Sequence, residues 1–349
     1  MREVSAEVKA LNGELTEVEG KIEELAGTLP NLPDPEAPDG MTEEDSSELR
    51  VVGDPPEFSF DPVDHLELGE RHGWIEMEAA AEVSGSRFAY LLGDLVMVEM
   101  ALVRFALETL RAEGFTPAAP PVLVREQALY GTGFFPGERE MIYEVPKDEL
   151  FLVGTSEVSL ASLKAGATMD AAELPLRYAG FSTCFRREAG AAGRDTRGIF
   201  RVHQFDKVEM FSFVEPSASG SEHERILALQ EQILSALEIP YRVVDIAVGD
   251  LGASASRKFD CEGWIPSQQR YRELTSCSNT TDYQARRLRA RYRPSDGAPP
   301  EEVHTLNGTA VAVGRSLIAI LENNQREDGS VRMPGVLQEF GVPGSIPNL

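Results

Sequence analysis

A regular repeat of apolar residues opens the chain. These residues recur at alternating spacings of four and three, which is a heptad seam made of Val4, Val8, Leu11, Leu15, Val18, Ile22 and Leu25. The period predicts a helix over residues 2–25, and such a seam needs cover, either from a second helix or from the body of the protein. Prolines at Pro30, Pro33, Pro35 and Pro38 then end the helix and open an acidic linker over about residues 31–60.

The rest of the chain mixes helical and strand-like patterns, with no internal repeat. Helical patterns cover residues 91–113, 222–237 and 315–324, and strand-like runs cover residues 149–153, 177–185, 204–213, 241–247 and 270–275. Strands outnumber the helices that could cross between parallel strands. We therefore predict an α+β fold with an antiparallel β-sheet flanked by helices. We predict that residues 1–28 belong to the N-terminal helix and that residues 29–349 form one continuous domain.

The charge balance restricts the partners of the protein. Asp and Glu outnumber Lys and Arg by 58 to 33, which gives a formal net charge of −25. Such a surface repels a phosphate backbone unless its basic residues gather in one place. No apolar run approaches the roughly 18 residues of a membrane span, and the first residues lack the apolar core of a secretory signal. The sequence predicts a cytoplasmic protein without a membrane segment.

The three cysteines carry no metal or disulfide signal. Cys184, Cys261 and Cys277 are widely spaced, without a CxxC pair. That spacing indicates neither a disulfide framework nor a zinc site.

The densest basic cluster lies in and around one predicted loop. It contains Arg186, Arg187, Arg194, Arg197 and Arg201, and small residues follow Glu188 in the run Gly190, Ala191, Ala192 and Gly193. Arginine at a strand end suits bidentate binding of phosphate, and small residues let a loop approach a ligand closely. From composition alone, the cluster fits either a phosphate site or a solvated basic hairpin.

Six blocks in order resemble one enzyme family. Residues 185–209 resemble motif two of class II aminoacyl-tRNA synthetases. Over its whole length, this segment resembles motif two of the seryl enzyme in particular. Residues 114–121 resemble motif one, and residues 314–324 resemble motif three. The blocks at 155–157, 273–279 and 304–309 are also similar to the seryl enzyme. The resemblance runs from about residue 29 to 325. It implies a homodimer that activates L-serine with ATP and Mg²⁺ and transfers it to serine tRNA.

The resemblance also implies roles at the ATP end of a site. Arg186 would hold the α-phosphate and the attacking carboxylate oxygen, and Arg315 would hold the γ-phosphate or the adenine. Glu188 and Val202 would contact the adenosine, and Phe205 would stack on the adenine. Glu273 and Ser276 would ligate Mg²⁺, an ion that takes a few oxygen ligands plus water. The remaining expected ATP-binding residues are Arg187, Arg201, Leu274 and Thr275.

A second set of residues is expected to select serine over other amino acids. Serine differs from alanine by one hydroxyl, so a site that hydrogen-bonds this hydroxyl rejects alanine strongly. By resemblance, Glu209 and Thr309 would bind the hydroxyl end. Thr155 and Glu157 would lie near the ammonium group, and Asn307 would support the pocket. Ser156 belongs to the same substrate-binding block. The predicted catalytic residues are Arg186, Glu273 and Arg315.

The first helix departs from the family pattern. Seryl-tRNA synthetases begin with a long two-helix arm that grips tRNA, and the resemblance implies that only the end of the second helix is present here. Its charges are Glu3, Glu7, Glu14, Glu17, Glu19, Glu23 and Glu24 against Arg2, Lys9 and Lys21. This acidic face is unsuited to phosphate contact.

Three explanations of this departure stay open. The chain is a seryl-tRNA synthetase with a shortened start, a paralogue that passes serine from its adenylate to a carrier protein or another non-tRNA acceptor, or a regulatory homologue without turnover. The regulatory homologue would be expected to lack Arg186, Glu273 or Arg315, and all three are present.

Overall fold

The computed structural model describes residues 2–189, 195 and 197–347. Five loop residues named above, Gly190, Ala191, Ala192, Gly193 and Arg194, lie outside this part of the chain. The side chains of Arg2, Glu3, Glu23 and Glu24 lie outside it as well.

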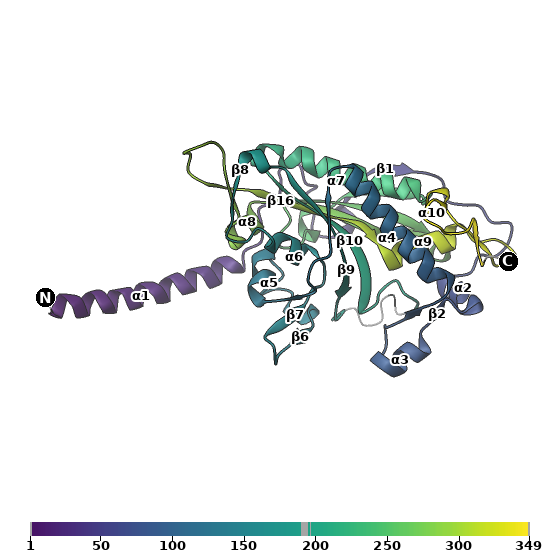
Figure 1. Cartoon of the computed structure of the whole chain (residues 1–349), viewed down its shortest axis with the longest axis horizontal. Helices are drawn as coiled ribbons and strands as arrows, with labels where there is room; N and C mark the ends of the chain where they lie inside the picture. The colour runs from purple at the N-terminus through teal and green to yellow at the C-terminus, as the bar shows by residue number, and fades with distance from the viewer. Residues whose placement is uncertain (1, 190–194, 196, 348–349) are drawn as a thin grey trace.

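A large sheet forms the centre of the body (Figure 1). Across the described residues its strands lie in the order β1 (Ser47–Val52), β11 (Tyr241–Asp245), β12 (Arg257–Ile265), β13 (Arg270–Thr281), β16 (His304–Ala312), β10 (Gln204–Val214), β9 (Leu176–Phe185) and β4 (Thr116–Ala118). Neighbours pair antiparallel, except that β4 runs parallel to β9. The prediction of an α+β fold built on an antiparallel sheet flanked by helices is confirmed.

Part of the predicted linker over about residues 31–60 is a strand, β1. Residues 47–52 do not belong to an irregular segment but pair antiparallel with β11 at the edge of the sheet. Arg50 forms an ion pair with Glu231 of helix α7 (Ser219–Ala236), which fastens the strand to the body. The strand escaped prediction because nearly all of its side chains are exposed, so it carries no apolar face.

Three helices cover one face of the sheet: α4 (Asp94–Ala112), α7 and α9 (Val313–Asn323). Alternate residues of β10, such as Val208 and Met210, face these helices in the main core. Side chains alternate between the faces of a strand. The odd-numbered positions of β10 therefore face the opposite side of the sheet. There, Phe211 and Phe213 pack with helices α6 (Glu157–Ser162) and α8 (Tyr283–Leu288) in a second core.

Short elements complete the body. The helices are α2 (His65–His72), α3 (Glu78–Ser84), α5 (Glu126–Thr132) and α10 (Gly335–Gln338). The strands are β2 (Ile75–Glu76), β3 (Tyr90–Leu91), β5 (Leu123–Val124), β6 (Glu144–Val145), β7 (Leu150–Leu152), β8 (Thr168–Asp170), β14 (Arg291–Arg293), β15 (Glu301–Glu302), β17 (Val331–Arg332) and β18 (Ser345–Ile346).

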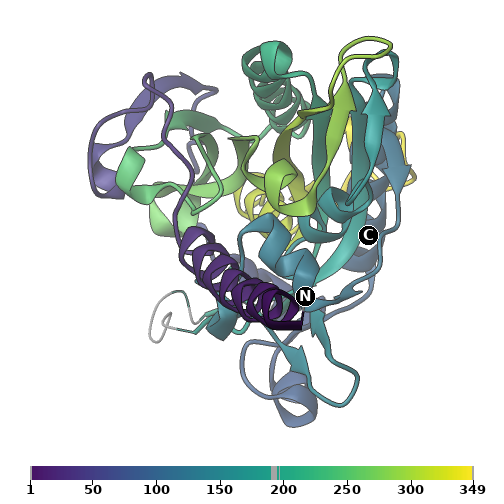
Figure 2. The same ribbon diagram turned by 90° about the vertical axis from the view of Figure 1, so that its left-hand side faces the viewer.

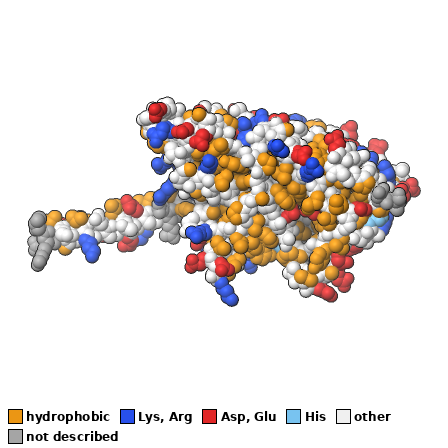
Figure 3. All heavy atoms as spheres, in the orientation of Figure 1, with side chains coloured by type: hydrophobic (Ala, Val, Ile, Leu, Met, Phe, Trp, Pro, Cys, Tyr) orange, Lys and Arg blue, Asp and Glu red, His pale blue; other side chains and the backbone are white. Residues whose placement is uncertain are grey.

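Helix α1 (Arg2–Gly27) projects away from the body (Figures 1 and 2). The seven side chains of its predicted seam are 50% to 69% exposed, and Figure 3 shows apolar atoms along its length. The predicted helix is confirmed, and its seam does not fold back on the body. The chain after the helix is anchored by Asn31, whose amide nitrogen donates to the carbonyl oxygens of Ser254 and Thr280.

Candidate active site

A cavity of about 250 Å³ opens beside strands β10, β13 and β16. Phe205, Lys207 and Glu209 line it from alternate positions of β10, on the face away from helices α4, α7 and α9. The strand period therefore places one aromatic ring, one cation and one carboxylate in a row along the cavity wall.

Two β-bulges determine which residues of the neighbouring strands share this wall. Ala310 is the extra residue where β16 pairs with β10, so that Glu209 lies opposite Thr309. Leu274 is the extra residue where β13 pairs with β12. A bulge shifts the alternation of side chains by one residue. As a result, Glu273 and Ser276 both line the cavity, although an odd spacing separates them.

One end of the cavity is a buried polar network. The Lys207 ammonium forms an ion pair with Glu209 and donates to the Thr155 hydroxyl at 2.6 Å. The Thr309 hydroxyl donates to Oε2 of Glu209 at 3.3 Å. Glu209 is 2% exposed, so its charge is stabilised mainly by these partners and not by water.

Glu157 is the second carboxylate of this end. Its Oε1 accepts hydrogen bonds from Gln284 at 2.7 Å and from Asn307 at 3.0 Å. Burial and the negative charge of Glu209 raise the pKa of Glu157 to about 7, although the Gln284 hydrogen bond and Lys207 oppose the shift. A cationic ligand between Glu157 and Glu209 would remove this repulsion.

Positive side chains gather at the other end. Arg186, Lys258 and Arg315 line the cavity there together with Glu273. Desolvation opposes ionisation of Glu273, but the charges of Arg315, Lys258 and Arg186 outweigh it and lower the pKa of that carboxyl. This end can therefore hold a polyanion while Glu273 remains ionised.

Aromatic rings flank these cations. The Arg186 guanidinium lies 5.4 Å from the centre of the Phe205 ring, and its Nε donates to the carbonyl oxygen of Gly154 at 3.2 Å. Phe200 receives two guanidinium groups, from Arg272 at 4.0 Å and Arg315 at 4.8 Å from its centre. Flat apolar surfaces next to fixed charges suit a ligand with a planar base and phosphates.

Most of the predicted site residues come together in this cavity. The lining includes Thr155, Glu157, Arg186, Glu188, Arg201, Val202, Phe205, Glu209, Glu273, Leu274, Ser276, Asn307, Thr309 and Arg315. Three others do not line it. Ser156 is fully buried and its hydroxyl points to the carbonyl oxygen of Gly180, Thr275 is 1% exposed, and Arg187 donates its backbone N–H to Met141.

The sequence analysis missed several residues that build the site. Lys207 follows Phe205 at the strand period, and this spacing alone would have placed it on the cavity wall. Gln284, Phe200 and Lys258 carry no comparable signal. Gln284 comes from helix α8, and its partners Glu157 and Thr305 lie far away in the chain. Pairings between distant segments are invisible to a local pattern.

A divalent cation fits at Glu273 and Ser276. Glu273 is ionised, its side chain is 47% exposed, and both Glu273 and Ser276 line the cavity. Two protein oxygens leave room for phosphate and water, as Mg²⁺ requires. In the part of the chain that the structure describes, no group of three or more His, Cys, Asp or Glu side chains could hold a metal by itself.

Comparisons with known proteins agree with this geometry. Residues 142–324 match the family model described as the tRNA synthetase class II core domain (G, H, P, S and T). The serine–tRNA ligase of Acidothermus cellulolyticus is 55% identical over 97% of this chain and 80% of its own length, and that of Streptomyces coelicolor is 51% identical over the same shares.

Solved structures give the same result. The seryl-tRNA synthetase of Pyrococcus horikoshii, complexed with ATP, matches with a TM-score of 0.96 and 42% identity, over 99% of this chain and 82% of that one. The cytoplasmic serine–tRNA ligase of Naegleria fowleri, in complex with AMP, matches with a TM-score of 0.91 and 35% identity, over 97% and 81%. Among the described residues, no helix is long and apolar enough to cross a membrane. The chain belongs to the seryl-tRNA synthetase family, within class II of the aminoacyl-tRNA synthetases.

Proposed function

We propose that the protein activates L-serine with ATP and transfers it to the 3′ end of serine tRNA. One observation carries the proposal: a single cavity holds two buried carboxylates at one end and a group of cations with an ionised Glu273 at the other. The carboxylates suit the ammonium and hydroxyl groups of serine, and the cations suit a triphosphate.

The first step needs alignment more than a protein nucleophile. A carboxylate oxygen of serine attacks the α-phosphorus of ATP, a new P–O bond forms, and the bond to the bridging oxygen breaks, so that pyrophosphate leaves. Arg186 would bind the α-phosphate and the attacking oxygen, and Arg315 would bind the γ-phosphate or the adenine. Fixed positive groups stabilise the charge that develops on the phosphate oxygens.

The neighbouring residues would orient both substrates. Phe205 would stack on the adenine, with Glu188 and Val202 against the adenosine, while Glu209 and Thr309 would bind the serine hydroxyl. Thr155 and Glu157 would lie near the ammonium group, with Asn307 holding Glu157. Mg²⁺ held by Glu273 and Ser276 would neutralise phosphate charge.

In the second step the adenylate is consumed. A ribose hydroxyl at the 3′ end of tRNA attacks the seryl carbonyl, an ester forms, and AMP leaves with the electron pair of the broken C–O bond. We propose that the enzyme works in the cytoplasm, where the tRNA acceptor is found.

Helix α1 fits an arm that reads this tRNA. We assign residues 1–28 to the arm and residues 29–349 to the catalytic domain. The exposed seam of α1 is the kind of surface that an antiparallel second helix covers, burying apolar side chains worth about 1.5–3 kcal/mol each. The acidic charges on the described part of α1 leave phosphate contact to other parts of an arm.

A homodimer would complete the assembly. Helix α4 exposes Met97 and Met100, and Tyr90 and Leu92 expose apolar surface before it. Figure 3 shows apolar atoms gathered on this face of the body. Large exposed apolar patches mark association surfaces, and motif one forms the dimer in the family that the chain resembles.

Serine-dependent exchange of labelled pyrophosphate into ATP tests the activation step. We expect exchange with serine and Mg²⁺, and much less with alanine. Charging of serine tRNA then tests the acceptor, with a rate that falls steeply as salt is added. Exchange without charging would move the proposal to a carrier protein or another acceptor, and no exchange at all would favour a homologue without turnover.

A further inference from the structure

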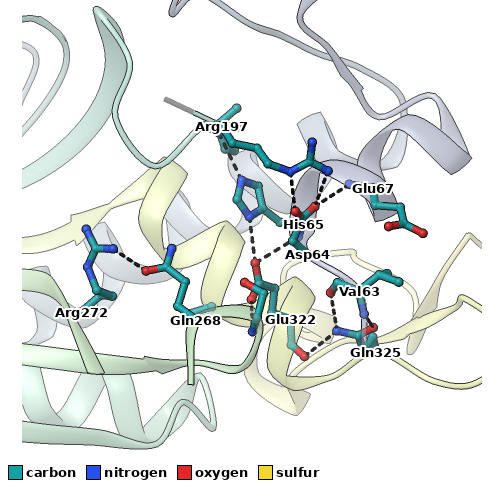
Figure 4. Close-up of polar contacts among 12 residues, drawn as sticks. Val63, Asp64, His65, Glu67, Arg197, Gln268, Arg272, Glu322 and Gln325 are labelled. Carbon is teal, nitrogen blue, oxygen red and sulfur yellow. Dashed lines mark hydrogen bonds and ion pairs between the residues drawn. The ribbon is translucent and has the colours of Figure 1, made fainter. Parts of the chain in front are cut away.

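Two adjacent residues at the start of helix α2 contact the segment that leads into the cavity wall. This segment, residues 197–202, leads directly towards strand β10 and is named the return limb. Four of its residues, Ile199, Phe200, Arg201 and Val202, line the cavity. Figure 4 shows His65 between Arg197 and Glu322, with Asp64 next to it.

His65 binds the limb through its ring. The backbone N–H of Ile199 donates to Nε2 of His65 at 3.2 Å, and Nδ1 lies 2.8 Å from Oε1 of Glu322 (Figure 4). Because Nε2 accepts a hydrogen bond, it carries no proton, and Nδ1 must therefore be the donor to Glu322. The imidazole thus links the limb to helix α9, which also carries Arg315.

Glu322 holds the ring in this orientation. Its Oε1 also accepts from the backbone N–H of His65 at 3.0 Å, and its Oε2 accepts from the N–H of Ser267 at 3.0 Å. Both side chains of the pair are buried, at 6% and 0% exposure. Gly198 precedes the contact with a φ of +70°, and a side chain there would collide with the imidazole.

Asp64 binds the limb at its first residue. Nε of Arg197 donates to Oδ2 of Asp64 at 2.6 Å, while Oδ1 accepts from the N–H of Glu67 at 2.8 Å and caps helix α2. One carboxylate therefore serves both the helix and the limb. The Arg197 side chain is 62% exposed, so this ion pair contributes little to folding.

The return limb also contacts the arginine side chains at the positively charged end of the cavity. The Phe200 ring lies against the guanidinium groups of Arg272 and Arg315, and Arg201 donates to Glu188 at 2.8 Å. A shift of the backbone at Ile199 would carry Phe200 with it and remove the surface on which Arg315 rests. Among the described residues, none of these contacts of the limb involves Glu209 or Thr309, at the serine end.

We propose that His65 and Asp64 are positioning residues, which hold the return limb so that Phe200, Arg201 and Arg315 are aligned for ATP. The inference rests on the proposed activation of serine with ATP. It requires that weakening these contacts raises the KM for ATP while the KM for serine stays unchanged. A purely structural role would lower the thermal stability and the yield of folded protein, and both KM values would stay the same.

Variants of His65 provide the first test, by pyrophosphate exchange. His65→Asn can donate to Glu322 but is too short to accept from Ile199, and we expect the KM for ATP to rise about tenfold or more. His65→Gln offers an amide donor and a carbonyl acceptor, and we expect it to stay within about threefold of wild type. Equal, wild-type KM values for ATP in both variants would overturn the role of His65.

A double-mutant cycle on Asp64 and Arg197 tests the proposal without changing the buried pair of His65 and Glu322. Arg197→Ala and Asp64→Asn, which retains the capping oxygen, should each raise the KM for ATP about two- to fivefold. The double variant should be no worse than either single variant. Arg71→Ala removes an exposed pair with Glu67 on the same helix, away from the limb, and should behave as wild type. Additive effects, or an equal effect of Arg71→Ala, would overturn the proposal.

The activity of the wild-type protein distinguishes a failure of the proposed function from a failure of the positioning role. If wild type shows no serine-dependent exchange, the proposed function fails. If wild type is active and the variants match its KM for ATP, the function stands and the positioning role fails.

Discussion

Glu209 and Thr309 lie opposite each other where strand β10 pairs with β16, and the Thr309 hydroxyl donates to Oε2 of Glu209. The bulge at Ala310 sets this pairing. A hydroxyl donor and a buried carboxylate acceptor therefore occupy the same spot on the cavity wall, where the hydroxyl of a bound serine could join them.

Glu209→Gln should lower kcat/KM for serine by about 10- to 150-fold, because a hydrogen bond to a charged group contributes about 1.5–3 kcal/mol. The preference for serine over alanine should shrink with it. Pyrophosphate exchange with each amino acid measures both effects. Glu222→Gln is the matched control, since Glu222 is also buried but binds Arg177 and Ser212 outside the cavity. A Glu209→Gln enzyme with unchanged discrimination would remove Glu209 from serine selection.

Glu157 should make the free protein less stable as the pH rises. Burial and Glu209 raise its pKa from 4.5 to about 7 in the folded state. A group with a raised folded pKa contributes stability that is fully present below the unfolded pKa and is lost as pH rises through the folded pKa. Wild type should therefore lose up to about 3 kcal/mol relative to Glu157→Gln between pH 5 and pH 8. Denaturant unfolding of both proteins across this range measures the difference.

Glu222 supplies a control of opposite sign for this experiment. Burial opposes its ionisation, but the hydrogen bonds from Arg177 and Ser212 outweigh burial and lower the pKa of Glu222. Its contribution to stability is present above the unfolded pKa and is lost as pH falls through the folded one. The deficit of Glu222→Gln should thus be larger at pH 8 than at pH 4. Parallel curves for wild type and Glu157→Gln would contradict the role assigned to Glu157.

The main strand of the site was predictable, because its pattern is local. Residues 204–213 form a strand-like run in the sequence, and β10 spans Gln204–Val214. The bulges at Ala310 and Leu274 were not predictable, since an unpaired residue depends on which strand lies next to it. Glu273 and Ser276 therefore share a wall for a reason that strand alternation cannot supply. Their expected roles came from the family resemblance alone.

Strand β1 shows the same limit at the edge of the sheet. The prolines before it and the acidic residues around it indicated a linker, and its exposed side chains gave no apolar face. Pairing with β11 provides backbone hydrogen bonds that do not depend on side-chain type. The exposed seam of α1 is the opposite case, since the period predicted the helix correctly but could not show whether the body covers it.

Glu273→Gln should weaken the response to Mg²⁺. Removing one anionic oxygen ligand should raise the Mg²⁺ concentration for half-maximal exchange about tenfold or more, at saturating ATP and serine. Glu262→Gln is the matched control, because Glu262 pairs with Glu273 across β12 and β13 but its carboxylate binds Arg242. An identical Mg²⁺ response in both variants would rule out Glu273 as a ligand.

Met100→Glu should weaken the proposed homodimer. A two-fold interface would place the new charge twice against an apolar surface, so the dissociation constant should rise about tenfold or more. Sedimentation velocity over a range of concentrations measures this change. Leu163→Glu, at an exposed leucine that follows helix α6, should leave association unchanged. If wild type sediments as a monomer at all concentrations, the exposed apolar side chains of α4 do not form a homodimer interface.

Arg186→Lys should lower kcat for exchange by about 100-fold, with every amino acid that the enzyme accepts. The planar guanidinium can bind two oxygens at once and also rests on Phe205, and a lysine keeps the charge but loses both contacts. Arg187→Ala is the neighbouring comparison, because the Arg187 side chain does not line the cavity, and we expect it to change the KM for ATP less than threefold. Single-turnover formation of the adenylate separates chemistry from product release in both variants. If Arg186→Lys forms the adenylate at the wild-type rate, the α-phosphate must be held by another cation of the cavity, such as Lys258.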